Sequence, residues 1–366
     1  MSFVKNSDKA VSMQSSRIRY IDLVKCLAIY LVVVGHTFQI ENTYSQAVVY
    51  LRLIIVFHMP LFAILSGMFF DVRGGWVTFF RKKGISLVLP YLVWCAIHVL
   101  IRIVSFHARM GEWPSLQQIA YNYWMTITNW GWWFIRALIF CFFFAYSSIR
   151  MSKGHTEAAI FCSILILYSL SFSSIIPNQL SLTKGFIFLY PFFCIGILLR
   201  KHNRWIKKHI RSVLLLSLIG FCAMLPFWKG YPDTFYTMNT SLLAPVGEMG
   251  IVGWLVFQRT LFRFAIGVFG SVAIILLFDC GEKYLPTESR WIRMCQTIGQ
   301  RTLAIYILSG CVHEYFWTTP LGSDVWLSWL YSLILSVVII WACVLICKWT
   351  EWYPIGLFLW GKQHRK

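Results

Sequence analysis

The chain has 366 residues, of which 58% are hydrophobic and only 13% are charged, and its mean hydropathy is +0.65. A soluble globular domain carries about 25% charged residues, so the composition excludes that class and predicts an integral membrane protein. The net charge of +19 arises from 33 Lys and Arg against 14 Asp and Glu. These cations stand in short runs between long apolar stretches, which indicates membrane topology and no nucleic-acid partner.

Apolar runs of about 20 residues, long enough to cross the bilayer as a helix, recur ten times along the chain. They cover approximately residues 20–40, 47–70, 84–105, 132–150, 157–176, 184–200, 210–229, 262–279, 300–317 and 325–347. The stretch 242–258 is weaker, because Pro245 and Glu248 interrupt it, and we expect a re-entrant or interfacial piece there. The sequence therefore predicts an all-α integral membrane protein with about ten transmembrane helices.

The positions of the basic residues orient these helices. Of the 33 Lys and Arg, 24 lie in the two termini and in the loops that share their side, and five lie in the opposite loops. Cytoplasmic segments carry an excess of Lys and Arg, so both termini are expected in the cytoplasm. The predicted organisation is a cytoplasmic N-terminal tail over 1–19, a single transmembrane domain over 20–347 and a cytoplasmic C-terminal tail over 348–366.

The cysteines indicate neither a disulfide framework nor a metal site. Nine of the eleven lie inside apolar segments, where cysteine acts as a small buried residue. Cys280 and Cys295 lie in a polar stretch, but neither belongs to a CxxC pair. We therefore expect no bound metal.

Several ionisable side chains lie inside the predicted spans, where each costs a few kcal/mol unless it faces a cavity or a partner. They are Lys25, Arg52, Arg102, Arg136, His36, His58, His98, His313 and Glu314. Each also has a plainer interpretation, because lysine and arginine near the end of a span extend to the interface and a buried histidine often serves packing alone. A purely structural bundle does not require so many of them.

The first span carries a polar stripe. Lys25 and His36 are 11 residues apart, which is about 1100° around a helix and about 16 Å along it, so they share one face. Asp22 lies one turn before Lys25 on nearly the same side. The stripe places a cation toward the cytoplasm and an imidazole toward the outer half of the membrane.

Two further clusters suggest ligands. Arg81, Lys82 and Lys83 stand at the cytoplasmic start of the third span, where three cations suit an anionic ligand or the headgroups of anionic membrane lipids. On the outer side, residues 106–133 hold seven Trp and Tyr, including Trp132 and Trp133. An interfacial aromatic belt explains some of them, whereas so dense a cluster also suits stacking against sugar rings.

Two motifs resemble a known family. Arg19-Tyr20-Ile21-Asp22-Leu23-Val24-Lys25 followed by Val34-Gly35-His36 resembles the first helix of the acyltransferase 3 family of membrane O-acyltransferases, whose signature is a cation, ten residues and a histidine. Phe57-His58-Met59-Pro60-Leu61-Phe62 with Ser66-Gly67 is similar to the form in fucose 4-O-acetylase-like members. Weaker matches in the same order are the basic run before Pro90-Tyr91, Trp133-Phe134-Ile135, Pro191 to Gly196, and Ile298 to Tyr306.

The resemblance implies a ten-helix, multi-pass enzyme of the bacterial inner membrane. Such an enzyme takes an acyl group, usually acetyl, from cytoplasmic acetyl-CoA and places it on a sugar hydroxyl of a cell-surface or lipid-linked glycan at the outer face. His36 corresponds to the catalytic histidine and Lys25 to the cation position, while Arg81, Lys82 and Lys83 correspond to the site for the CoA phosphates. Members often have a histidine shortly after the Tyr306 motif, where this chain has Ser309 and then His313 four residues later.

A neutral imidazole is suited to take the proton from a sugar hydroxyl as it attacks a thioester. We expect His36 to be this general base, or an acyl relay. Glu41 is able to orient the imidazole only if the first helix ends there. Arg52, Arg102 and Arg136 are unranked donors for the developing oxyanion, and a role for His313 is open.

Two other function classes fit parts of the pattern. A proton-coupled transporter of a polar or glycan-related solute also requires buried His, Arg and Glu. It would favour inverted repeats with broken helices, and the sequence has no such repeat. A glycan-binding subunit without chemistry would explain the aromatic cluster but not the stripe that joins Lys25 and His36.

Overall fold

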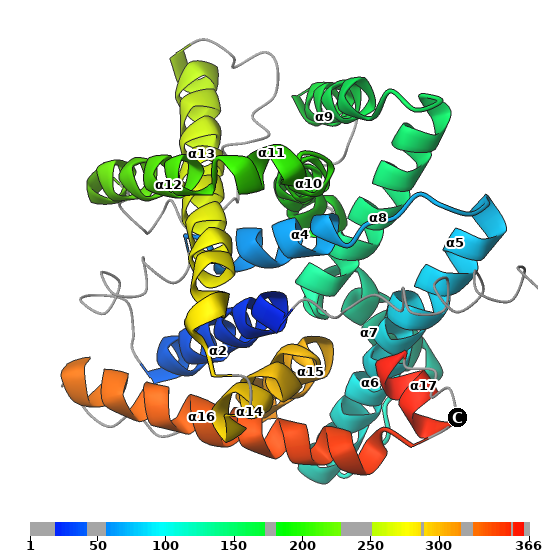
Figure 1. Cartoon of the computed structure of the whole chain (residues 1–366). Coiled ribbons are helices and arrows are strands. Elements are labelled where there is room, and N and C mark those ends of the chain that lie inside the picture. The colour runs from blue at the N-terminus through cyan, green and yellow to red at the C-terminus, as the bar shows by residue number, and fades with distance from the viewer. Residues whose placement is uncertain are drawn as a thin grey trace, which may run out of the picture.

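The computed structural model describes residues 19–41, 56–172, 181–227, 251–286, 289–315, 325–352 and 354–361. Within these ranges every regular element is a helix and no strand occurs, which confirms the predicted all-α class (Figure 1). In chain order the α- and π-helices are α2 (Arg19–Glu41), α4 (His58–Met68), α5 (Trp76–Lys83), the π-helix η1 (Gly84–Val88), α6 (Leu89–Met110), α7 (Leu116–Met125), the π-helix η2 (Thr126–Trp130), α8 (Trp133–Met151), α9 (Thr156–Phe172), α10 (Ser181–Lys201), α11 (Asn203–Lys208), α12 (Ile210–Met224), α13 (Ile251–Gly281), α14 (Arg290–Gly299), α15 (Thr302–Tyr315), α16 (Val325–Thr350) and α17 (Ile355–Trp360).

In the described part of the chain, six helical stretches are long and apolar enough to cross a membrane. They are Arg19–Phe38, Trp76–Met110, Trp133–Met151, Ile210–Phe227, Leu261–Tyr284 and Trp329–Thr350. Three shorter apolar helices, His58–Met68, Thr156–Leu170 and Thr302–His313, fall in three more of the predicted spans, and α10 falls in the remaining one. The count of ten crossings and the side of each terminus stay predictions.

The structure changes one predicted boundary. Residues 251–258 were expected to belong to a re-entrant or interfacial piece, and they form the first turns of α13, which continues without a break to Gly281, so they are not separated from the next span by a re-entrant turn. The interrupting Pro245 and Glu248 precede this helix and lie outside the described residues. Because 251–281 contains no proline or cap, no local signal ends the helix between residues 251–258 and the predicted span 262–279.

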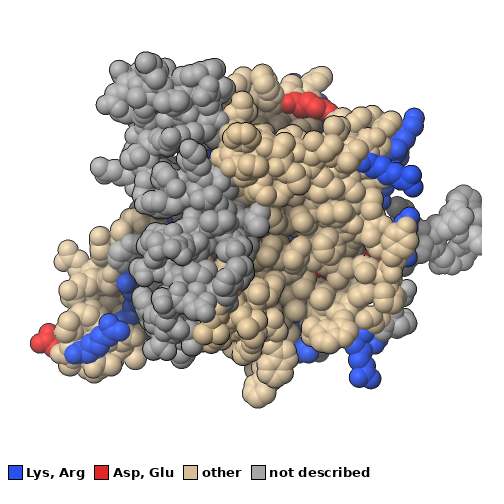
Figure 2. All heavy atoms as spheres, turned by 90° about the vertical axis from the view of Figure 1, so that its left-hand side faces the viewer, with Lys and Arg blue, Asp and Glu red and all other residues tan. Residues whose placement is uncertain are grey.

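The surface agrees with a membrane environment. On the face shown in Figure 2, the described surface is almost entirely uncharged and the Lys and Arg side chains lie near its margins. Both α12 and α16 expose large apolar side chains, among them Leu216, Ile219, Ile334 and Trp341. Soluble monomers rarely expose so much contiguous apolar surface, whereas lipid covers it in a membrane protein.

Helix α2 is central to the bundle. In Figure 1 it lies between α4 above and α15 and α16 below, and it also contacts α13 and α14. Val24, Ala28 and Val33 of α2 are fully buried. The helix that carries the polar stripe is therefore enclosed on most sides by other helices.

Helices α4 and α10 cross with their backbones in contact. A Cβ atom on Gly67 would lie 1.9 Å from the carbonyl oxygen of Phe193, and one on Gly196 would lie 2.0 Å from the carbonyl oxygen of Ile64. Only glycine fits at such a crossing, and small residues at helix contacts are typical of membrane proteins. Gly299, at the end of α14, approaches Asp22 of α2 equally closely.

The basic run 81–83 lies on α5, before the predicted start of the third span. α5, η1 and α6 form one continuous helical stretch over Trp76–Met110. Pro90 has no backbone N–H and cannot bond to the carbonyl of Ser86, so the regular ladder is disturbed one turn earlier, where η1 lies. The helix thus begins about two turns earlier than the apolar pattern suggested.

The α4–α10 crossing gives a stability prediction. Gly67→Ala forces the two backbones apart, and overpacking of this kind costs about 1 to 3 kcal/mol. Thermal unfolding in mild detergent, followed by size exclusion, should show a clear fall in the midpoint. Gly84→Ala is the control, because a Cβ there meets nothing within 4 Å. Equal midpoints for the two variants would contradict the close crossing.

Candidate active site

An apolar cavity of about 260 Å³ lies among α2, α4, α8 and α15. From α2 it is lined by Lys25, Ile29 and Val32, and from α15 by Thr302, Leu303 and Tyr306. Among the described residues that line it, Lys25 is the single charged one. Its side chain nitrogen lies 4.8 Å from the centre of the Phe69 ring, an attractive arrangement for a cation in an apolar setting.

His36 lies on the face of α2 that lines this cavity, one turn beyond Val32. On α15, His313 is two turns beyond Tyr306, again on the cavity-lining face. The structure brings the two histidines together, with ring centroids 5.7 Å apart. Neither histidine lines the cavity itself. The imidazole pair thus lies beyond the cavity, on the continuation of its two lining helices.

Beside this pair lies a group of hydroxyls that was not predicted from the sequence. Thr37 Oγ1 lies 2.9 Å from Nε2 of His313 and 3.3 Å from Oγ of Ser336 on α16. Ser336 in turn donates to the carbonyl oxygen of Ser332 at 2.6 Å. The only sequence signals were the position of Thr37 next to His36 and two serines four residues apart in an apolar run.

The structure divides the basic run. Arg81 and Lys82 line a second hollow of about 470 Å³, which Ser86 of η1 and Gly361 also border. Lys83 instead faces the bundle, with its nitrogen 3.5 Å from the centre of the Phe142 ring. Two of the three predicted phosphate-binding cations therefore share a hollow, and the third does not.

Comparison with known families decides the class of protein. The acyltransferase domain of the acyltransferase 3 family matches residues 18–348, which is most of the chain. The chain belongs to the acyltransferase 3 family. With its membrane-length apolar helices, it is a membrane-bound acyltransferase.

Two curated bacterial proteins are similar to this acyltransferase 3 member. It is 28% identical over 304 residues to nodulation protein NolL of Sinorhizobium fredii (strain NBRC 101917 / NGR234), covering 80% of this chain and 76% of that protein. It is 24% identical over 318 residues to nodulation protein NolL of Mesorhizobium japonicum (strain LMG 29417 / CECT 9101 / MAFF 303099), covering 83% of this chain and 79% of that protein. No solved structure matches the chain.

Arg136 of this acyltransferase supports the backbone of η2. The side chain is buried, and its Nη1 donates to the carbonyl oxygen of Ile127 at 2.9 Å. The hydroxyl of Tyr91 donates to the same oxygen at 2.6 Å. A π-helix leaves backbone carbonyls less regularly bonded than an α-helix, and these two donors satisfy one of them.

The aromatic cluster separates into exposed and packed members. Trp113 is 65% exposed and stacks on His107 with ring centroids 3.9 Å apart, and Tyr121 and Trp124 are also exposed. Trp132 instead donates to the carbonyl oxygen of Ile307 at 3.2 Å. Trp133 packs so closely over Gly185 that a Cβ there would lie 2.8 Å from its ring.

Other predicted residues do not line either hollow. His58 is buried at the start of α4, and Arg102 is half-buried on α6, one turn beyond buried His98. α2 is described as far as Glu41, and the expected role of Glu41 in orienting His36 stays a prediction. The side chains of Glu41 and Glu314, and the whole of Arg52, lie outside the described residues.

No group of three or more His, Cys, Asp or Glu that could hold a metal ion occurs within the described ranges.

Helix ends that are predicted to share the cytoplasmic side contact one another at two places. Gln300, before α15, donates to the Asp22 carboxylate at the start of α2 at 3.3 Å. Arg200 at the end of α10 donates to the carbonyl oxygen of Phe70, just after α4, at 2.7 Å. These contacts agree with the alternation of the basic loops.

The loop after α4 on this side holds a charged pair. Arg73 Nε donates to both carboxylate oxygens of Asp71, at 3.0 and 2.9 Å. These hydrogen bonds lower the pKa of Asp71. The loop therefore keeps a carboxylate ionised between the Arg73 and Arg200 guanidiniums.

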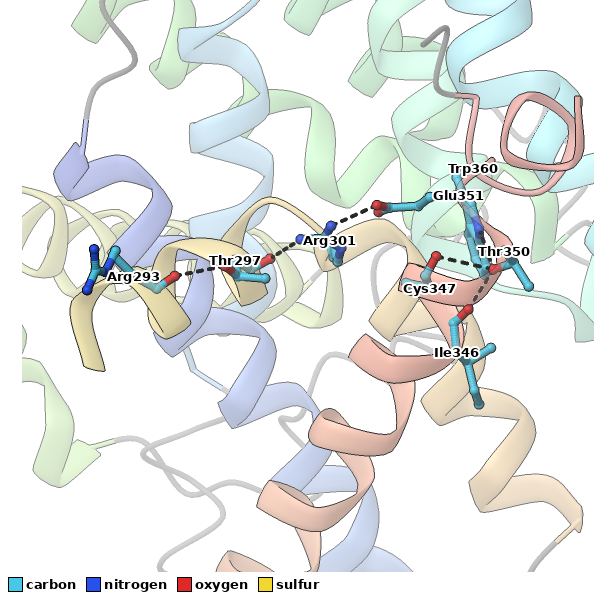
Figure 3. Close-up of polar contacts among 8 residues, drawn as sticks. All are labelled: Arg293, Thr297, Arg301, Ile346, Cys347, Thr350, Glu351 and Trp360. Atoms are coloured by element: carbon cyan, nitrogen blue, oxygen red, sulfur yellow. Dashed lines mark hydrogen bonds and ion pairs between the residues drawn. The ribbon is translucent and has the colours of Figure 1, made fainter. Parts of the chain in front are cut away.

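An ion pair joins α15 to the end of α16 on the same side (Figure 3). Arg301 Nη2 lies 2.7 Å from Glu351 Oε2, and the two side chains are only 15% and 14% exposed. One residue earlier, Thr350 accepts a hydrogen bond from Trp360 of α17 at 3.0 Å. The pair and this bond hold the C-terminal helix against the bundle.

Breaking this ion pair should destabilise the protein. Glu351→Gln leaves the Arg301 cation largely buried with a weaker acceptor, at a cost of about 1 to 3 kcal/mol, and thermal unfolding in detergent measures it. The double variant Arg301→Gln with Glu351→Gln should recover part of the loss. Glu157→Gln is the matched control, since its ion pair with Lys201 is exposed and such pairs contribute little. A Glu157→Gln loss as large as that of Glu351→Gln would contradict the assignment.

Proposed function

We propose that this enzyme is an O-acetyltransferase that moves an acetyl group from cytoplasmic acetyl-CoA to a sugar hydroxyl of a cell-surface or lipid-linked glycan. The reaction takes place toward the outer face of the bacterial inner membrane. The observation that supports this best is the line formed on α2 by Lys25, the apolar cavity and His36. It joins a basic region at one end of the bundle to a pair of imidazoles near the other.

The two hollows suit the two chemically different parts of the donor. Arg81 and Lys82 supply cations for phosphate groups. The apolar cavity suits the uncharged pantetheine arm and its acetyl thioester. Both hollows border η1, where Ser86 lines the basic one and the next residue, Leu87, lines the apolar one.

The chemistry assigned to His36 is general-base catalysis. The sugar oxygen attacks the thioester carbonyl and forms the new C–O bond while His36 accepts the hydroxyl proton. The C–S bond then breaks, which leaves the ester and releases CoA. The proton on His36 passes to the departing CoA sulfur, so no net proton is gained or lost. His313 lies beside this base, with the ring centroids 5.7 Å apart.

The acceptor would approach from the opposite side to the CoA phosphates. Trp113, Tyr121 and Trp124 are exposed, on the loop and helix that follow α6. Aromatic faces of this kind suit stacking against sugar rings as well as contact with the membrane interface. Trp132 and Trp133 contribute to helix packing, so the proposal places acceptor contacts on the exposed members.

Removing His36 should abolish most of the transfer. Membranes with wild-type or His36→Ala protein are incubated with radiolabelled acetyl-CoA and an extract of surface glycans and their lipid-linked precursors. Loss of a general base lowers the rate about 10²- to 10⁴-fold, measured as alkali-labile label in glycan. His155→Ala, in the exposed turn before α9, is the control. Normal transfer by folded His36→Ala protein would overturn the assignment, and no label with wild type would overturn the acetyl-CoA reaction.

The basic hollow should determine the affinity for the donor. Arg81→Ala combined with Lys82→Ala removes two charge-assisted contacts, so the KM for acetyl-CoA should rise about 10- to 100-fold with a smaller change in kcat. Arg204→Ala with Lys208→Ala removes two exposed cations from α11 on the same side and is the control for lipid interactions. Equal changes in KM for both pairs would show that the cations act on the membrane and not on CoA.

A further inference from the structure

Two helices bury hydroxyls on one side of the imidazole pair. Thr37 of α2 is 1% exposed, and Ser332 and Ser336 of α16 are both fully buried. Thr37 follows His36 directly, so its side chain points about 100° away from that of His36 around α2. His313 contacts both, through the ring of His36 and through the hydroxyl of Thr37.

The hydroxyl hydrogen of Thr37 is already used within α2. Oγ1 donates to the carbonyl oxygen of Val33 at 2.9 Å, and a hydroxyl has one hydrogen but two lone pairs. With that bond made, Oγ1 accepts from Nε2–H of His313, 2.9 Å away. Thr37 therefore acts as a fixed acceptor for His313.

Ser336 borders this arrangement from the third helix. Its hydrogen is donated within α16 to the carbonyl oxygen of Ser332, so Ser336 does not compete with His313 as a donor to Thr37 Oγ1, 3.3 Å away. Thr37 is thus fixed by its own helix and bordered by α16.

We propose that Thr37 is a positioning residue that holds the ring of His313 beside His36. The proposal rests on the proposed function, in which His36 accepts the proton of the acceptor hydroxyl. If the His313 ring rotated about its χ angles, both the space beside His36 and the polarity of its surroundings would change. Active sites depend on such supporting hydrogen bonds to hold reacting groups in place.

Two substitutions at Thr37 separate positioning from packing. Thr37→Val keeps the shape and removes the acceptor, whereas Thr37→Ser keeps the acceptor and removes a methyl group. In membranes with matched amounts of folded protein, Thr37→Val should lower kcat about 10-fold or more and leave the KM for acetyl-CoA unchanged, because neither hollow includes Thr37. Thr37→Ser should keep most of the activity.

Ser163→Ala is the matched control for loss of a buried hydroxyl. Ser163 pairs with Tyr190 at 2.8 Å on α9 and α10, away from α2, and its loss should leave kcat unchanged. Unchanged kcat in Thr37→Val would overturn the proposal. So would equal losses of kcat in Thr37→Val and Thr37→Ser, because the shared defect would then be packing.

A second measurement does not depend on transfer. Diethyl pyrocarbonate modifies accessible imidazole nitrogens, and mass spectrometry of the 302–315 segment reports the rate at His313. Release of Nε2 in Thr37→Val should raise this rate several-fold, while Thr37→Ser and Ser163→Ala should match wild type. If wild type transfers no acetyl group, the proposed function fails, and the modification rates still decide whether Thr37 holds His313. Equal rates in all four proteins would overturn the proposal.

Discussion

A polar side chain within the hydrocarbon of a membrane needs a partner or a cavity, and this constraint is concentrated on α2. Lys25 lies at a cavity and near the ring of Phe69, whereas His36 lies beside His313. Thr37 is bonded to its own helix and to His313. Each of these polar groups on α2 has its contacts on a different neighbouring helix. The positions of those helices around α2 therefore determine whether the polar stripe is accommodated.

Close helix contacts make this arrangement possible. Lipid tails are as apolar as leucine, so membrane helices associate through packing and hydrogen bonds and not through burial from water. Gly67 and Gly196 let the backbones of α4 and α10 touch, and Gly299 does the same for α14 against Asp22. α4 and α15 are therefore held near α2 at the depths where they line the cavity.

The sequence was sufficient for properties that depend on one helix. The all-α class, the range of α2 and the shared face of Lys25 and His36 follow from composition and helical spacing. Contacts between helices did not follow, because the relative register of α2, α15 and α16 depends on packing, and so Thr37 and Ser336 were missed. The position of Lys83 near the ring of Phe142, apart from the hollow that Arg81 and Lys82 line, did not follow either. The hydrogen bond from Arg136 to η2 depends on a π-helix that the sequence did not indicate. The roles of these residues in the reaction stay predictions.

The separation of charge along α2 has a consequence for the proposed reaction. Lys25 is the single charged side chain among the described residues that line the cavity, and most of the other lining side chains are apolar. A polar path would admit water, which competes with the sugar hydroxyl for the thioester, whereas a dry path protects the donor. The cations suited to the phosphates lie on α5, and His36 lies about 16 Å beyond Lys25 along α2. The donor would then keep its charged part in the cytoplasm while its uncharged arm reaches the acceptor, so transfer across the membrane would not require the charges to cross.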